Sequence, residues 1–365
     1  MLKKYIDDAK KCFFEYDSLE DKVKAYDTYC TLLDYYEAVT GINVCNQLEK
    51  YVSNEIKNLH QSLTNHTLED LVKYKEYHKK ITKSSVLKLD SVLQEVADSS
   101  YLFSIDTDSY YRLSKEENRE NWELFFQYLG KHKELKDLYF KICHNHNCYF
   151  SRNEAHSFFA VDYLLEEYLL LIGKGNSSLD TVVDIVHELG HASEYQYDVD
   201  INHVFGKLEF MQENLFSEVM SSYFEQEFLE YYLKHTSQKV EGVLKAMDFF
   251  DNCEGKLYMI FSASSLDDES IYQLEGKDSF VDDKKIVEDI DVDYFDRRFV
   301  YEDSAILYGY GFLISSYLLE HPEKIDCFLE MRREEFSPQL LEELGIREDN
   351  VCDIIDSRCQ KVFGK

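Results

Sequence analysis

The chain has 365 residues, of which 71 are acidic and 40 are basic, so its formal net charge is −31. A charge of this sign repels phosphate groups, which argues against nucleic-acid binding through a basic surface and against adhesion to anionic membranes. Hydrophobic residues make up 44% of the chain, aromatic residues 15%, and only two residues are prolines. This composition differs from that of disordered acidic chains and predicts a large buried core.

The sequence offers no feature of a membrane or secreted protein. No apolar run reaches the roughly 18 residues that a membrane-spanning helix needs. The first residues lead directly into charged positions without an apolar signal region. The nine cysteines are spread along the chain and form no dense framework, which favours reduced thiols. We therefore expect a soluble, cytoplasmic protein, and its oligomeric state stays open.

The first part of the chain is predicted to be helical. Apolar residues at helical spacing predict helices within residues 1–40 and over 44–62, 67–80, 86–99, 116–129 and 133–143. Polar clusters at 62–65, 106–109 and 145–147 mark breaks. We expect an N-terminal helical region over residues 1–100 and a catalytic region over 101–365, together forming one compact unit.

Two β-like stretches follow, at residues 157–161 and 168–172, and glycines lie directly after the second. They predict a hairpin or the edge of a small sheet. From about residue 178 the helical pattern returns, with the last helices over 302–320 and 348–362. The acidic stretch 267–293 is less regular and is expected to contain loops. The fold class is therefore mainly α, with a small sheet or hairpin.

Residues 187–191 form the pattern H-E-x-x-H. On a helix, His187 and His191 lie on one face, so both imidazoles can bind one metal ion. Glu188 lies beside them, where it can contact a water at the metal instead of the metal itself. The neighbouring arc of this helix is apolar, as a core-facing side should be. Ser177 or Ser178 can cap the start of the helix.

A third ligand is expected downstream of the motif. Glu218, 27 residues after His191, is the best candidate, because small serines beside it would allow its helix to approach closely. Glu225 lies seven residues further on and suits an acceptor for the N–H group of a ligand histidine. Glu213 is the competing third ligand, although it points to a different side of the predicted helix.

The motif and the spaced Glu218 resemble the oligoendopeptidase F and thimet oligopeptidase family of zinc metallopeptidases. This family carries H-E-[LF]-G-H and a downstream glutamate in a segment similar to residues 217–225. The Tyr- and Gly-rich segment 301–312 also resembles a family segment, and the likeness covers roughly residues 145–320. It implies a zincin-type metallopeptidase with one Zn²⁺ held by His187, His191 and Glu218.

The resemblance further implies hydrolysis of internal bonds in short peptides, with Glu188 as general base. Family tyrosines bind the substrate and the tetrahedral intermediate, which points to Tyr308 or Tyr310, with Tyr301 in the same segment. The chain also departs from the family. Only 186 residues precede the motif, Glu194 stands where a histidine is frequent, and arginines at 297 and 298 stand near another such position.

Two alternative interpretations of the whole protein accompany this prediction. The chain could be an inactive or weakly active relative that binds peptides or partners around a structural zinc site; the intact Glu188 argues against this. It could also be an acidic helical scaffold with a fortuitous motif.

Residues 143–148 read C-H-N-H-N-C and suggest a second metal site, but this spacing is not that of a standard zinc knuckle. We expect a reduced, partly buried loop there.

Overall fold

A computed structural model describes residues 2–42, 44–61, 67–98, 119–151, 157–173, 175, 177–203, 205, 215–274 and 304–364. The described chain is mainly helical and contains one three-stranded sheet, which confirms the predicted fold class at this level. Contacts group the chain into two compact units. The first comprises Met1–Thr64 and Ser114–Glu213, and the second Asn65–Leu113 and Asn214–Lys365. The predicted boundary at residue 100 falls outside the described residues.

The first unit contains a three-stranded sheet and most of the N-terminal helices. Its helices are α1 (Leu2–Glu15), α2 (Leu19–Thr40), η1 (Glu49–Tyr51), α3 (Asn54–Gln61), α7 (Arg119–Lys131), α8 (Lys133–His144) and α9 (Ser178–Asn202). The continuous helix predicted over 44–62 is wrong. The side chain of Asn46 accepts hydrogen bonds from the backbone N–H groups of Leu48 and Glu49, and this local turn replaces the first helical turns.

The sheet has the strand order β1-β3-β2, with β1 (Cys148–Phe150), β2 (Phe158–Asp162) and β3 (Glu167–Ile172). β2 and β3 form the predicted antiparallel hairpin. Asp162 closes its turn, since its Oδ1 accepts hydrogen bonds from the N–H groups of Leu164 and Leu165 at 2.9 and 3.0 Å. β1 pairs with β3 in parallel and was not predicted from the sequence.

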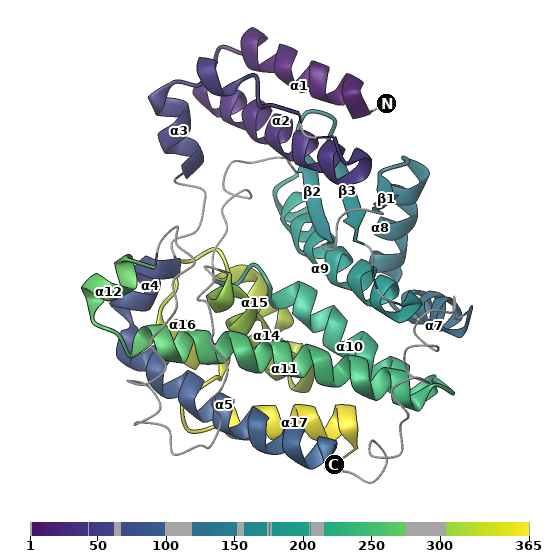
Figure 1. The fold of residues 1–365 in the computed structure, drawn as a ribbon, viewed down its shortest axis with the longest axis vertical. Helices are drawn as coiled ribbons and strands as arrows, with labels where there is room; N and C mark the ends of the chain where they lie inside the picture. Colours follow the sequence, from purple (N-terminus) through teal and green to yellow (C-terminus); the bar gives the residue numbers. More distant parts are fainter. Residues whose placement is uncertain are drawn as a thin grey trace. The chain divides into compact units, whose positions relative to one another are not determined.

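The two faces of this sheet contact different helices (Figure 1). On one face, the buried Tyr35 of α2 donates a hydrogen bond to the Leu170 carbonyl at 2.5 Å, and its ring lies edge-on to Phe158 at 5.6 Å. Because successive side chains of a strand alternate in direction, Phe159 points to the opposite face, which α9 covers. Tyr168 of β3 also faces α9, where its hydroxyl donates to Gln196 at 2.8 Å.

The second unit consists of helices. They are α4 (Thr67–Lys73), α5 (Lys75–Ala97), α10 (Val219–His235), α11 (Lys239–Ser264), α12 (Asp268–Tyr272), α14 (Ala305–Glu320), η3 (Pro322–Lys324), α15 (Ile325–Met331), α16 (Pro338–Leu344) and α17 (Val351–Phe363). α14 is apolar on nearly all sides and packs against α10, α11 and α17, as expected for a central helix. Figure 1 shows α5 alongside α11 and α17.

The helix break in this part of the chain lies earlier than predicted, between α4, which ends at Lys73, and α5, which begins at Lys75. The sequence predicted an interruption between residues 80 and 86, but α5 continues through this stretch. Thr82 and Ser85 are buried there and donate hydrogen bonds to the carbonyl groups one turn earlier, so they are satisfied within the helix. The acidic stretch 267–293 was predicted to contain loops. Its first part forms the short helix α12, and its residues beyond 274 lie outside the described part of the chain.

Among the helices that the structure describes, none combines the length and the apolar composition that crossing a membrane requires.

Candidate metal centre

The H-E-x-x-H motif lies within α9, as predicted. The rings of His187 and His191 are adjacent, with centroids 5.1 Å apart and planes at 77°, and both side chains are half-buried. Glu188 is 5% exposed. Ser177 caps the helix in a complete capping box, since it exchanges hydrogen bonds with Asp180 at 3.0 and 3.1 Å. The choice between Ser177 and Ser178 that the sequence left open is therefore settled for Ser177.

The β2–β3 hairpin packs against the part of α9 that carries the motif. Phe159 of β2 stacks on the ring of His191, with centroids 6.5 Å apart and planes at 15°. One turn before His187, Asp184 accepts a hydrogen bond from Ser157 at 2.8 Å, and Ser157 in turn accepts one from the N–H of Gly173. Sequence reasoning missed Phe159, although the period of two along a strand beside the motif could have indicated it.

Glu218 belongs to a different element from the one expected. It lies at the N-cap of α10, in the turn before the helix, and is not within the helix. The hydroxyl of Ser221 is 2.9 Å from Oε2 of Glu218 and 3.0 Å from its carbonyl oxygen. Glu218 is 9% exposed and Ser221 is fully buried. The Glu218 carboxylate is therefore held by Ser221, in the first turn of α10.

The three predicted ligands belong to different units: His187 and His191 lie in the first and Glu218 in the second. Together they form a group of described residues that could hold a metal ion. Two imidazole nitrogens and one carboxylate oxygen are a donor set that zinc takes in catalytic sites, where a fourth position stays open. The donors thus fit the predicted ion in number and in kind.

The other predicted residues have varied environments. Tyr308 is partly buried, and Nζ of Lys256 lies 5.6 Å from its ring centroid. Tyr310 is fully buried, and its hydroxyl lies 2.6 Å from Nδ1 of His78. Glu225 is half-buried in α10; burial raises the pKa of the Cys253 thiol, and the nearby charge of Glu225 raises it further. Glu213, Tyr301 and the arginines at 297 and 298 lie outside the described residues.

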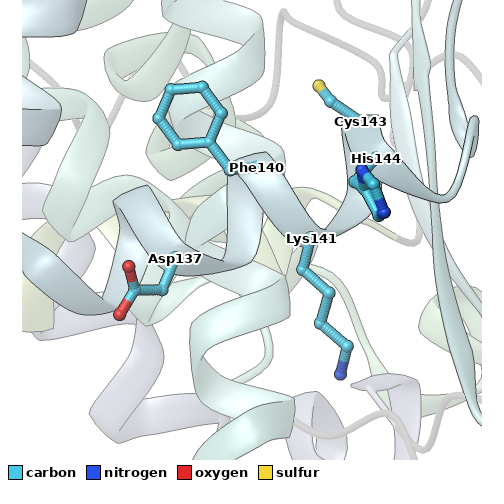
Figure 2. Close-up of a pocket in the computed structure, with 5 residues that line it drawn as sticks. All are labelled: Asp137, Phe140, Lys141, Cys143 and His144. Carbon is cyan, nitrogen blue, oxygen red and sulfur yellow. The ribbon is translucent and has the colours of Figure 1, made fainter.

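The C-H-N-H-N-C segment joins the end of α8 to β1. Its two thiols interact with each other, and the hydrogen bond from Cys148 lowers the pKa of Cys143 to about 7. Figure 2 shows Cys143 and His144 in a shallow pocket with Asp137, Phe140 and Lys141, where the side chains spread around α8 instead of converging. Within the described residues, the group of His187, His191 and Glu218 is the one that could hold a metal.

Comparison of the chain with protein-family models, with curated proteins and with solved structures gives no match.

Proposed function

We propose that this protein is a zinc-dependent peptidase that hydrolyses internal bonds of short peptides. The observation that carries this proposal is the adjacency of the His187 and His191 rings on α9, with centroids 5.1 Å apart and the buried Glu188 beside the first histidine on the same helix. A structural zinc site has no need of a general base, whereas hydrolysis requires one. The resemblance to the oligoendopeptidase F and thimet oligopeptidase family supports the same activity.

In this proposal His187, His191 and Glu218 hold the ion. When bound, zinc supplies a Lewis acid that lowers the pKa of a coordinated water towards ~7 and polarises the substrate carbonyl. Glu188 accepts a proton from the water as it attacks the peptide carbonyl and then delivers that proton to the departing amine. The low exposure of Glu188 keeps its carboxylate away from bulk water, which strengthens its interaction with the reacting proton.

Two further elements are proposed to serve the substrate. A tyrosine hydroxyl from the segment of Tyr301, Tyr308 and Tyr310 would donate to the developing oxyanion. Of these, Tyr310 would first have to exchange its bond with His78. β2 is an edge strand among the described strands, and such an edge can pair with an extended peptide. Its Phe159 lies against the metal-ligand side chain of His191.

The first test separates catalysis from metal binding. We expect the purified protein to bind one zinc ion and to cleave quenched peptides of about ten residues, with cleavage lost after chelation. Glu188→Gln should retain zinc and lower kcat by about 10²- to 10⁴-fold, because the proton acceptor is lost. Asp200→Asn, an exposed carboxylate near the end of the same helix, is the matched control and should cleave normally. Zinc without any cleavage would instead support the non-catalytic relative.

The second test concerns the third ligand. Glu218→Ala should weaken zinc binding far more than Glu213→Ala, measured by competition with a chromophoric chelator. The reverse order would show that Glu213 is the ligand. Absence of zinc binding even after reconstitution would leave the acidic scaffold as the remaining interpretation.

A further inference from the structure

Glu218 is bordered by two small residues from different helices, one at its carboxylate and one at its backbone. Ser221 lies one turn into α10 and holds Oε2, as described above. Gly311 of α14 lies on the other side. A Cβ atom at Gly311 would come within 2.8 Å of both the Cβ and the carbonyl oxygen of Glu218, and 3.0 Å of its carbonyl carbon. Atoms at these separations overlap, so only glycine allows α14 to lie this close to Glu218.

The second glycine of α14 differs from Gly311 in what surrounds it. A Cβ at Gly309 would meet Ile260 Cδ1 at 2.7 Å and Leu257 Cδ2 at 3.2 Å. Both atoms are at the ends of flexible side chains, which can rotate away, whereas Glu218 would be displaced through its backbone. The two glycines therefore form a matched pair, of which only Gly311 lies against Glu218.

We propose that Ser221 and Gly311 are positioning residues for the metal ligand Glu218. Ser221 holds one carboxylate oxygen and leaves the other for the ion, and Gly311 admits the Glu218 backbone against α14. This inference rests on the proposed function, since it assumes that Glu218 binds zinc. It also gives the Gly-rich part of segment 301–312 a role distinct from that of its tyrosines. Groups that orient a ligand in this way commonly change metal affinity by about 10- to 100-fold when removed.

The test measures zinc affinity by chelator competition in Ser221→Ala and Gly311→Ala. We expect each to lose about 10- to 100-fold in affinity. Ser222→Ala is the control for the first variant, because Ser222 is also buried and its backbone N–H bonds the Glu218 carbonyl. Gly309→Ala is the control for the second. Both controls should bind zinc with nearly wild-type affinity, and thermal unfolding of all four variants shows whether each is folded.

A spectroscopic signature distinguishes positioning from general loss of stability. The visible absorption of the Co²⁺-substituted protein depends on the number and geometry of the ligands, so it should change in Ser221→Ala and Gly311→Ala but not in the controls. If Gly311→Ala does not fold, Ser221→Ala still decides. Unchanged affinity and spectrum in the folded positioning variants, with Glu218→Ala strongly impaired, would overturn this inference alone. Unchanged affinity in Glu218→Ala would overturn the proposed ligand set itself.

Discussion

His78 is a buried histidine with a defined partner. Its Nδ1 lies 2.6 Å from the hydroxyl of Tyr310, Nε2 lies 3.2 Å from the Asp70 carbonyl, and the ring stacks on Phe336 at 5.3 Å. Burial disfavours the charged imidazolium and lowers its pKa from 6.5 to about 4. The nearby Tyr77 and Tyr310 carry no charge at acidic pH, and burial raises their pKa values further. His78 is therefore a neutral hydrogen-bonding group in the second unit.

This lowered pKa predicts a loss of stability in acid. Below pH 6.5 the unfolded chain binds a proton at His78 that the folded chain does not accept until about pH 4. The free energy of unfolding is thus unaffected by His78 above pH 6.5 and falls as the pH drops towards 4, by about 3 kcal/mol in total. His78→Gln, which cannot titrate, should lose less stability over this window in denaturant titrations. Parallel pH profiles of the two proteins would contradict the prediction.

At the scale of elements, the capping box stabilises the first turn of α9. Ser177→Ala removes the acceptor for the N–H of Asp180 and should lower the free energy of unfolding by about 1 kcal/mol. Ser177→Asp retains an acceptor and places a negative charge at the helix N-terminus, so it should be close to wild type. Urea unfolding checks both, and hydrogen exchange should show faster exchange in the first turn of Ser177→Ala. Equal stability of the two variants would exclude a role for the cap.

The elements that the sequence predicted well are those set by local signals. The cap of α9, the hairpin and the helix carrying H-E-x-x-H follow from residues close together in the chain. β1 was missed because it has three residues and exists through its pairing with β3, some 20 residues away. The uninterrupted α5 was missed because Thr82 and Ser85 belong to residue types that favour helix ends and turns, whereas here both are buried and bond to the preceding helical turn.

In the candidate site, too, some residues were predicted from local sequence patterns and others depend on contacts between elements. Its histidines and Glu188 follow from helical periodicity, and Glu218 was predicted from the small serines beside it together with the family resemblance. Its position before α10, and not within it, was not predicted, and there its carboxylate accepts a hydrogen bond from Ser221. Phe159 and Gly311 act through contacts between different elements; the strand period could have indicated the face of Phe159, but no local pattern indicates that Gly311 lies against Glu218.

At the scale of the whole molecule, the dominant property is the net charge of −31. A field of this sign concentrates cations near the protein, both the divalent ion and any amine-bearing peptide. At low ionic strength it acts over distances much longer than a hydrogen bond, since the Debye length is ~30 Å at 0.01 M salt and ~8 Å at 0.15 M. The charge that argues against nucleic acid as a partner therefore also predicts a substrate preference.

We predict that basic peptides are cleaved with a higher kcat/KM than acidic peptides at low salt, because the field raises their association rate. Two peptides with the same central sequence, differing only in lysine or glutamate at positions distant from the cleaved bond, make the comparison. The ratio of their kcat/KM values should fall towards one as salt is raised to roughly 1 M, where the Debye length is ~3 Å. A ratio that does not depend on salt would place the preference in direct contacts at the site. Acidic peptides cleaved as fast as basic ones at low salt would show that the field has no part in substrate choice.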